Sequence, residues 1–410
     1  MKKTKKGKQT EDVDVPDTLT AEEQEILKNV EEGKVEDITV EEEKSKDEKY
    51  SYYRSLLYDI DPDDGLVYKD YDIISKQRKL IFTLIKQIGA NIVRGKSIMN
   101  VSLPVYIFEP YSLLDRTAAL FCYVPSMIEP IVDIVDPIER MKMLMTWSVS
   151  TLHIGIGQKK PFNPILGETY QGKIGDLSIY FEQTEHHPPI AHYLIVGKNL
   201  KMHGKYQIVA HTYPNSAKAA TYGRRCFEIK GKNPCRYTVT YPEAEITGMM
   251  FGRRTFKYID DYVFKDKTNK IYALIRFNPL KQGFFSSIFS KKAYRDDHIK
   301  GFITKNKELL SDTSESVFES KDIISHCEGN WIDNLFFDGK LYWELGKYTL
   351  TPLVGLPNKL RSDATLRPDL QALAKGNEKE SQRLKEIMEN VQRNDAKLRE
   401  HAAKAKAKSK

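Results

Sequence analysis

Hydrophobic positions first take up helical spacing near residue 71. Apolar residues recur at intervals of three, four and seven between residues 74 and 88, which predicts an amphipathic helix that ends near Gly89. The apolar run at residues 101–108 contains Pro104, which disfavours a helix, so an extended segment is predicted there. Helical spacing returns over residues 112–149, where three prolines divide the chain into short helices.

Beyond Pro161 the pattern becomes that of short strands. Alternating β-branched and aromatic residues are bounded by Gly, Pro and Asn, and no helical pattern separates them. This order favours an antiparallel sheet or barrel over βαβ units. A strongly helical stretch follows at residues 381–401, so we predict an α+β protein that is mainly β. The predicted strands are 168–181, 206–211, 225–229, 236–241, 258–264, 270–276, 299–304 and 341–344.

Composition and charge narrow the class of protein. The chain has 410 residues, of which 40% are hydrophobic, and its most apolar stretch, residues 118–135, is broken by prolines and acidic residues. This composition therefore predicts a soluble protein with one large core. The net charge of +7 is uneven, because residues 1–50 carry −6, residues 51–370 carry +8 and residues 371–410 carry +5. The positive charge of residues 51–410 indicates an anionic partner, which could be a nucleic acid or a membrane.

The four cysteines form no CxxC pair, and no apolar segment follows the basic N-terminus. These features predict reduced thiols in the cytosol and no secretory signal. The Glu- and Lys-rich residues 1–49 contain too few apolar residues to offset the entropy of ordering, so we expect them to be largely disordered.

One alternative function is nucleotide hydrolysis. Residues 90–97, Ala-Asn-Ile-Val-Arg-Gly-Lys-Ser, fit a relaxed phosphate-loop pattern that contains Lys96. A phosphate loop follows a strand and opens a helix, whose N-terminal amides bind the phosphates. Here a helical pattern precedes the motif and an extended pattern follows it. The order of elements therefore argues against a phosphate-loop NTPase.

A second alternative is a His-rich metalloenzyme. Five histidines lie between residues 186 and 211, close to Glu182 and Glu185. However, HExxH is absent, and the reversed motif fails because Glu182 occupies the place of its first histidine. Neighbouring histidines on a strand also point to opposite faces, which makes them poor shared ligands. We predict no metal, no cofactor and no catalytic residue.

Two turn-rich segments carry the remaining polar chemistry. Residues 182–189 read Glu-Gln-Thr-Glu-His-His-Pro-Pro, and two histidines fixed by a Pro-Pro pair can donate hydrogen bonds to an anion. Taken alone, the segment is better explained by a buried histidine pair before a turn, because histidine is commonly structural. Residues 159–169 read Lys-Lys-Pro-Phe-Asn-Pro-Ile-Leu-Gly-Glu-Thr, which by itself is an ordinary loop leading into a strand.

Together the two segments resemble the ligand-binding domain of the oxysterol-binding-protein-related lipid transfer proteins. The family's Glu-Gln-x-x-His-His-Pro-Pro fingerprint is matched at residues 182–189, and Lys-Pro-x-Asn-Pro-x-Leu-Gly-Glu is matched at residues 160–168. The resemblance runs from about residue 79 to residue 397. Further matches are Val-Ser-Leu-Pro at 101–104, Glu-Pro at 109–110, Gly-Asn-Trp at 329–331 and Leu-Arg-Pro-Asp at 366–369.

The resemblance implies a large incomplete antiparallel β-barrel around an apolar lipid tunnel. An N-terminal helical lid is expected at about residues 72–104 and a closing helix at about residues 381–401. Residues 71–400 then form a single domain between an acidic leader, residues 1–70, and a basic tail, residues 401–410. Such a protein extracts one lipid at a time and moves it between membranes, with no bond made or broken. It is expected to be cytoplasmic, to contact membranes transiently and not to bind nucleic acid.

The resemblance also implies a site for the head group of phosphatidylinositol 4-phosphate at the tunnel mouth. Three residues of this site, Lys385, Glu389 and Arg393, are spaced by four along the predicted closing helix. They therefore share one face of that helix, although a solvated ion-pair stripe has the same spacing. Glu185 departs from the family pattern beside the first histidine, where a carboxylate would raise the histidine pKa or repel a phosphate. The implied residues are Lys160, Asn163, His186, His187, Lys385, Glu389 and Arg393.

The second cargo is predicted from the lid, which looks more like the phosphatidylserine-carrying branch than the sterol-binding branch. Ile98 stands where that branch has an apolar lid residue, and Ser216 stands in its Pro-Lys-Ser motif, from which Asn215 departs. Phosphatidylserine is therefore favoured and sterol is the alternative.

Residues 281–292 form an aromatic loop flanked by lysines, which suits docking to anionic lipid, although a loop packed on the barrel has the same composition. The acidic run before residue 50 is a poor match to the FFAT tract that binds an endoplasmic reticulum receptor. The predicted docking residues are Phe284, Phe285, Phe289, Lys291 and Lys292.

Overall fold

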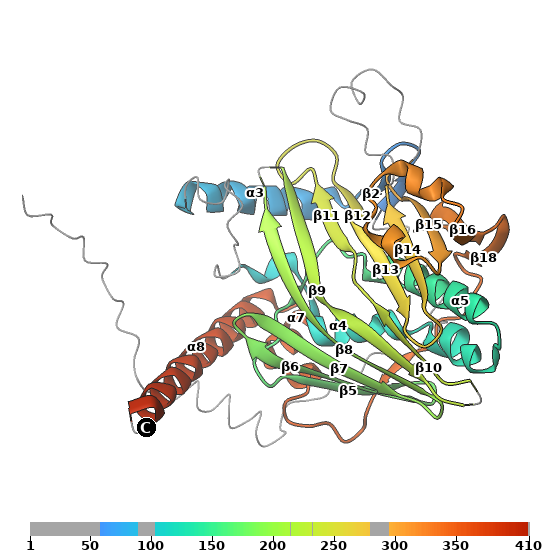
Figure 1. Ribbon diagram of the computed structural model, residues 1–410. Coiled ribbons are helices and arrows are strands. Elements are labelled where there is room, and N and C mark those ends of the chain that lie inside the picture. The colour runs from blue at the N-terminus through green and yellow to red at the C-terminus, as the bar shows by residue number, and fades with distance from the viewer. Residues whose placement is uncertain (1–57, 89–102, 214, 232, 279–294, 409–410) are drawn as a thin grey trace, which may run out of the picture.

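The computed structural model describes residues 58–88, 103–213, 215–231, 233–278 and 295–408. Within these ranges seventeen strands form one sheet, in which every pairing is antiparallel, and β3 pairs with β4 in a small parallel sheet (Figure 1). The prediction of a mainly β, antiparallel fold with flanking helices is confirmed. The leader up to residue 57, the phosphate-loop-like segment at 90–97, Ile98 and the loop at 281–292 lie outside the described residues.

The bounds of the elements follow the chain. The helices are α3 (Tyr71–Ile88), α4 (Leu113–Ala118), α5 (Pro137–Ser150), α7 (Pro368–Ala374) and α8 (Glu378–Lys408), with one π-turn at Val124–Ile128 and 3-10 turns at Val105–Ile107, Ala119–Phe121, Glu129–Asp133, Leu152–Gly155, Lys307–Ser311, Glu315–Glu319 and Ala364–Leu366. The strands are β1 (Tyr58–Asp61), β2 (Gly65–Tyr68), β3 (Phe108–Ser112), β4 (Lys160–Phe162), β5 (Thr169–Ile174), β6 (Leu177–His186), β7 (Pro189–Val196), β8 (Leu200–Thr212), β9 (Ser216–Ile229), β10 (Cys235–Val239), β11 (Glu243–Thr247), β12 (Thr255–Ile259), β13 (Asp261–Asp266), β14 (Ile271–Phe277), β15 (His298–Thr304), β16 (Ile323–Asn330), β17 (Asn334–Phe337), β18 (Lys340–Glu344) and β19 (Leu353–Gly355).

The sheet divides at its longest strand, β9. Strands run in the order β19, β5, β6, β7, β8 and β9, after which the two ends of β9 pair with different partners. One branch continues through β11, β12, β2 and β1, and the other through β10, β13, β14, β15, β16, β17 and β18. In the described part of the chain β18 and β19 each pair with a single neighbour, so the curved sheet is an incomplete barrel.

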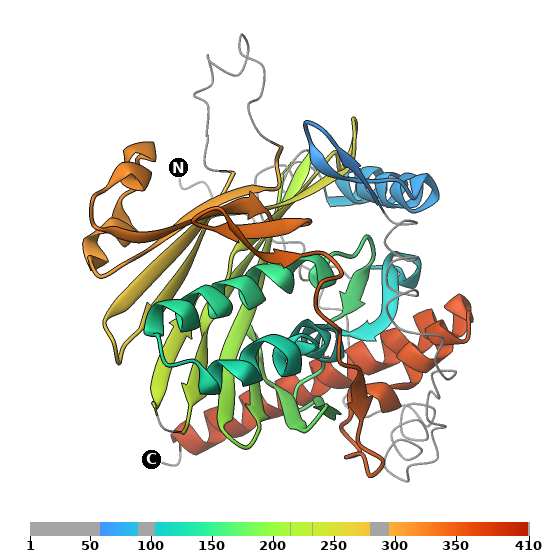
Figure 2. The same cartoon turned by 90° about the vertical axis from the view of Figure 1, so that its right-hand side faces the viewer.

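Helices fill one end of the curve. The helices between residues 113 and 150 lie within the concave side of the sheet, and α8 runs along its edge (Figure 2). Trp147 of α5 packs edge-on against Phe227 of β9, with ring centroids 5.4 Å apart, and Phe121 packs against Phe181 and Tyr193. The predicted division by prolines is confirmed, because Pro137 occupies the first turn of α5, where no intrahelical N–H bond is lost.

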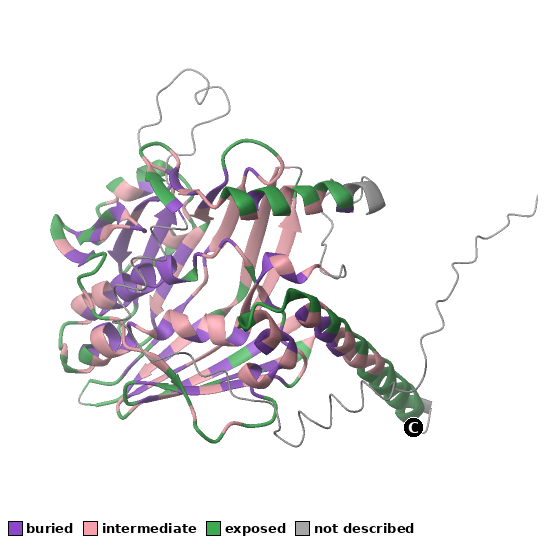
Figure 3. Cartoon of the chain, turned by 180° about the vertical axis from the view of Figure 1, so that it is seen from behind, coloured by how far each residue is buried: buried purple, intermediate pink, exposed green. Residues whose placement is uncertain are grey.

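At the opposite end of the sheet the strands are only partly buried. Residues 207–213 and 215–222 of β8, β9 and the turn between them, and all of β11, contain no fully buried side chain, whereas most of β14 and β15 is buried (Figure 3). Strand alternation from the buried Phe227 places Ala219 and Ala217 on the inner face. Their partners Ala244 and Ile246 face the same way, because directly opposed residues share a face. Small apolar side chains therefore line this half-exposed inner surface.

Four sequence-based assignments differ from the structure. The β1–β2 hairpin pairs with β12, so the fold begins before the predicted domain start at residue 71. The expected strands at 168–181 and 258–264 are each two strands, because turns at Gly175 and Asp260, both with positive φ, reverse the chain. Part of the extended segment at 101–108 is a 3-10 turn, which Pro104 precedes rather than interrupts.

Candidate functional site

Two lysines from distant segments meet above one aromatic ring. The parallel pairing of β3 and β4 sets Lys160 opposite Phe108, and α8 brings Lys385 to the same place. The Nζ atoms of Lys160 and Lys385 lie 5.1 and 5.6 Å from the centre of the Phe108 ring. Lys160 Nζ also donates to Asn163 Oδ1 at 2.5 Å. We call Lys160, Asn163, Lys385 and Glu389 the lysine group.

The helix α8 supplies an ordered row of charges to this group. Lys385 Nζ donates to Glu389 Oε1 at 2.6 Å, and Arg393 Nη2 lies 3.3 Å from Glu389 Oε2. The three side chains share one helical face, as their spacing predicts. They differ in exposure, because the Lys385 side chain is 6% exposed and the Arg393 side chain is 57% exposed. Only the Lys385 end of the row is therefore packed into the protein.

The proximity of the two lysines changes their acid–base behaviour. The pKa of Lys160 is lowered to about 8, chiefly because protein atoms crowd its ammonium group and secondly because Lys385 carries the same charge. Glu389 partly offsets this effect. The Lys160 side chain nevertheless remains in contact with solvent. The lysine group thus brings two ammonium groups together, and an anion would stabilise their charge.

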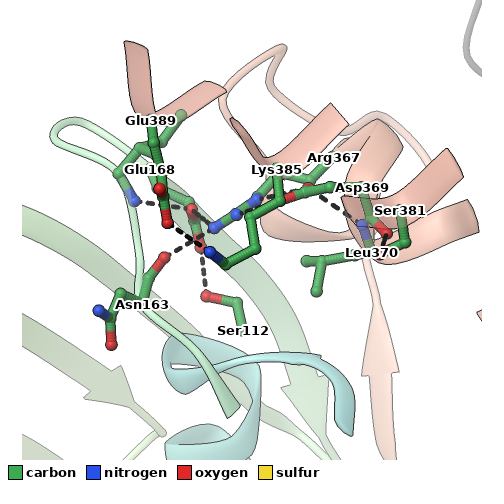
Figure 4. Close-up of polar contacts among 10 residues, drawn as sticks. Ser112, Asn163, Glu168, Arg367, Asp369, Leu370, Ser381, Lys385 and Glu389 are labelled. Carbon is green, nitrogen blue, oxygen red and sulfur yellow. Dashed lines mark hydrogen bonds and ion pairs between the residues drawn. The ribbon is translucent and has the colours of Figure 1, made fainter. Parts of the chain in front are cut away.

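A buried ion network fixes the segments that carry the lysine group (Figure 4). Arg367 pairs through two N–H groups with Asp369, at 3.1 and 2.6 Å, and through Nη1 with Glu168 at 2.8 Å. Nη1 also donates to the Asn163 carbonyl at 2.9 Å. Burial alone would lower the pKa of Arg367, but the charges of Asp369 and Glu168 raise it. The arginine thereby ties the Lys160–Glu168 segment to the start of α7.

The same network reaches β3 and α8. Ser112 donates to Glu168 Oε1, and Ser381 of α8 donates to the Asp369 carbonyl at 2.8 Å. Sequence reasoning assigned no role to Ser112, Arg367 or Asp369. The Leu-Arg-Pro-Asp match at 366–369 was the available signal, but a motif match alone does not show which side chains pair.

The two fingerprint segments are joined through backbone hydrogen bonds. Gly167 N–H donates to the Gln183 carbonyl at 2.8 Å, and Gln183 N–H donates to the Glu168 carbonyl at 2.9 Å. The Gln183 side chain donates to the Glu185 carbonyl at 2.7 Å. The structure therefore brings residues 160–168 and 182–189 side by side. The local sequence patterns of the two segments gave no means of predicting that contact.

The two histidines lie together at the end of the β6 strand. Their ring centroids are 4.5 Å apart in an edge-on arrangement, whereas strand alternation predicted opposite faces. The difference arises because β6 ends at His186 and the chain turns at His187 and Pro188. Nδ1 of His186 is buried and makes no hydrogen bond.

The pKa of His186 is lowered to about 4, first by burial, then by the charges of His187 and Arg399. The expectation that Glu185 would raise this pKa is wrong, because burial dominates and Glu185 is exposed. Arg399, the third cause, belongs to α8, the helix that also carries Lys385. The histidine pair and the lysine group therefore both lie beside α8.

The other histidines do not converge with this pair. His192 Nδ1 lies 2.8 Å from Thr184 Oγ1, and His203 Nε2 lies 3.6 Å from Glu228 Oε1. Among the described residues, no group of three or more His, Cys, Asp or Glu side chains could hold a metal ion.

Ser216 lies at the tips of two hairpins rather than in the lysine group. It begins β9 and pairs with Thr247 of β11. The adjacent Asn215 accepts hydrogen bonds from the amides of Met250 and Phe251 at 2.9 and 3.1 Å. Asn215, which departs from the family pattern, therefore joins the β8–β9 tip to the β11–β12 tip. None of the described helices is long and apolar enough to cross a bilayer.

Comparison with known sequences gives a consistent answer. The profile of the family described as "Oxysterol-binding protein" matches residues 83–409. Oxysterol-binding protein 9 of Dictyostelium discoideum is 30% identical over 335 residues, which are 79% of this chain and 76% of that protein. Human oxysterol-binding protein-related protein 5 is 26% identical, and the match covers 81% of this chain but 37% of that protein.

Solved structures show the same fold. The Osh3 ORD of Saccharomyces cerevisiae, determined in complex with PI(4)P, has a TM-score of 0.61 at 18% identity and covers 83% of this chain and 87% of its own. The Osh1 ORD domain in complex with ergosterol has a TM-score of 0.63 at 19% identity and covers 94% of this chain and 90% of its own. With the sequence profile and the Dictyostelium relative, this agreement shows that the chain belongs to the oxysterol-binding protein family.

Proposed function

We propose that the chain carries phosphatidylinositol 4-phosphate between membranes, with the phosphorylated head on the lysine group and the histidine pair. The carrying observation is the placement of Lys160 and Lys385 Nζ within 5.1 and 5.6 Å of one ring centre. Two adjacent ammonium groups repel each other, and a phosphate relieves that repulsion while accepting charge-assisted hydrogen bonds. The unbonded Nδ1 of His186 offers the head group a further hydrogen bond.

The proposed lipid tails lie against the inner face lined by Ala217, Ala219, Ala244 and Ile246. These residues belong to strands that are only half-buried on that side. Exposing an acyl chain to water costs roughly 0.8 kcal/mol per methylene, or about 12 kcal/mol for fifteen methylenes. A carrier must therefore offer a comparably apolar surface, and small side chains leave room for it. Extraction and release require no chemical reaction, so we assign the chain no enzymatic activity.

We further propose phosphatidylserine as the second cargo, with sterol as the alternative. The resemblance of the lid to the phosphatidylserine-carrying branch supports the first, and the Osh1 relatives determined with cholesterol and ergosterol support the second. Two lipids that use one inner surface exclude each other, which permits exchange along one lipid gradient. The proposed setting is the cytoplasmic face of organelle membranes, where the loop at residues 281–292 makes transient contact.

Transfer of fluorescently labelled phosphatidylinositol 4-phosphate between liposomes tests the head-group site. We expect the His186→Ala/His187→Ala variant to lose most of the transfer rate, because it removes two adjacent imidazoles. Lys96→Ala should leave the rate unchanged, whereas a phosphate-loop enzyme would depend on that lysine. Full transfer by the double histidine variant would contradict the assignment of the pair. Native mass spectrometry of the purified chain would identify a lipid that co-purifies with it.

A matched pair of variants tests the tail-binding surface. Ala219→Phe places a bulky ring on the inner face, while Ala220→Phe places the same ring on the outer face one residue away. The inner variant should lose long-chain lipid extraction but still bind a water-soluble inositol phosphate. The outer variant should match the wild type in both assays. Equal behaviour of the two variants would rule out the inner face as the tail site.

A further inference from the structure

A single arginine marks the boundary between the open and the packed ends of the sheet. Arg225 lies on β9, and strand alternation puts it on the inner face with Phe227 and Ala219. Phe227 belongs to the closed core, whereas Ala219 belongs to the half-exposed apolar face. Arg225 therefore lies where the surface proposed for lipid tails ends.

Aromatic rings surround the Arg225 guanidinium. Its central carbon lies 4.8 Å from the Tyr241 ring centre, 5.3 Å from Tyr262 and 5.4 Å from Trp147. Nη2 donates to the Tyr262 hydroxyl. Within the described part of the chain no carboxylate pairs with Arg225, although the residue is 7% exposed. Rings attract a cation but do not neutralise it, so the site retains a buried positive charge.

Several polar atoms around this charge also lack partners of hydrogen-bonding geometry. They include Nε of Arg225 and the hydroxyls of Tyr193 and Tyr241. Tyr193, Gly204 and Arg225 form one row across β7, β8 and β9. A Cβ atom at Gly204 would lie 2.8 Å from the Tyr193 hydroxyl, so the glycine leaves the space that this hydroxyl occupies. Buried polar groups are normally satisfied, and a cluster of unsatisfied ones around one cation indicates a missing anionic partner.

We propose that Arg225 and its tyrosines bind the carboxylate of a long-chain anionic amphiphile that enters the sheet carboxylate first. The proposal rests on the lipid-binding function and extends it to a second polar site at the inner end of the apolar face. A carboxylate matches the planar guanidinium and accepts hydrogen bonds from the nearby hydroxyls. The apolar chain then lies against the alanine-lined face. A neutral lipid would leave the buried charge uncompensated.

The test uses two probes with the same long chain, one ending in a charged carboxylate and the other in a neutral methyl ester. Cis-parinaric acid, a fluorescent long-chain carboxylate, and its neutral methyl ester are titrated into the full-length, delipidated protein. The wild type should bind the acid at least tenfold more tightly than the ester. Arg225→Gln should abolish that preference and leave the ester affinity within twofold of the wild type. Arg224→Gln is the matched control, because Arg224 is exposed on the opposite face, and it should retain the full preference.

Two further measurements keep the result decisive. Lys160→Ala/Lys385→Ala removes the other candidate anion site, and the acid preference should survive in it. Three results would each overturn the proposal. The lysine double variant could lose the preference for the acid, the wild type could bind acid and ester equally, or Arg225→Gln could retain the preference for the acid. Should Arg225→Gln fail to fold, Arg225→Lys and the lysine double variant decide the question. Phosphatidylinositol 4-phosphate transfer by Arg225→Gln should persist, so failure of the carboxylate site is distinguishable from failure of the proposed function.

Discussion

The lysine group and the histidine pair offer an anion two different kinds of interaction. Lys160 and Lys385 supply positive charge, and the Arg367 network behind them holds the surrounding segments in place. The pKa of His186 is lowered to about 4, so at neutral pH its imidazole supplies hydrogen-bonding groups rather than charge. The difference shows that residues joined by one sequence fingerprint or one proposed ligand need not share a physical role. Charge attracts the phosphate, and the neutral imidazole of His186 discriminates by geometry.

The largest expected effect comes from removing the buried arginine that holds the segments of the lysine group in place. Arg367→Ala would leave Glu168 and Asp369 buried without their shared cation, and both side chains are at most 1% exposed. Breaking such a buried pair costs about 3–5 kcal/mol of unfolding free energy. Urea unfolding measures this loss, and phosphoinositide binding should fall with it.

Arg361→Ala provides the control for this substitution, because Arg361 is an exposed arginine in the turn before the network. Its unfolding free energy should stay within about 0.5 kcal/mol of the wild type. A loss below about 1 kcal/mol in Arg367→Ala would show that the network does not hold the site.

The next effect separates two cations on one helix. Lys385→Met should weaken binding of a short-chain phosphatidylinositol 4-phosphate about 10- to 100-fold, since a charge-assisted hydrogen bond contributes about 1.5–3 kcal/mol. Arg393→Met should weaken it less than about fivefold, because exposed ion pairs contribute under about 1 kcal/mol. Titration calorimetry measures both affinities. The double variant Lys385→Met/Glu389→Gln distinguishes loss of the lysine from repulsion by the unpaired Glu389. Equal losses of affinity in Lys385→Met and Arg393→Met would contradict the idea that burial makes Lys385 the stronger contact.

The sequence predicted what depends on local pattern. Helical periodicity located α3 and α8, and four-residue spacing put Lys385, Glu389 and Arg393 on one face. Strand alternation identified most of the sheet, but it failed where chain reversal overrides it. Gly175 and Asp260 end strands that the apolar pattern continues, and the turn after His186 brings two histidine rings together.

Other features depend on contacts that no local pattern encodes. Arg367 and Glu168 are 199 positions apart, and the significance of Arg367 appears only when both are buried together. The pKa of His186 likewise follows from burial rather than from the adjacent Glu185. Arg225 has no distinguishing motif, and only the tertiary structure surrounds it with rings instead of carboxylates.

The smallest expected effects are pH responses. For both groups folding stability rises with pH, but in two separate pH windows. The folded-state pKa of His186, about 4, lies below its ordinary value of 6.5, so between these values the unfolded chain binds a proton that the folded chain does not. Folding stability from this residue is therefore lost as pH falls from 6.5 towards 4. His186→Gln should lose less stability than the wild type across that window in urea unfolding, while the exposed-site control His326→Gln should follow the wild type.

The lysine group should respond at alkaline pH. Lys160 has a pKa of about 8 in the folded protein against 10.5 ordinarily, so the folded chain releases this proton first as pH rises. Folding stability should consequently increase slightly between pH 8 and 10.5, while affinity for a short-chain phosphoinositide should fall several-fold because the ammonium charge disappears. Lys160→Met should remove both responses and leave the acid response of His186 intact. If alkaline pH weakened binding equally in Lys160→Met, the titrating group would have to be another cation, and Lys160 would not supply the charge that distinguishes this group from the histidine pair.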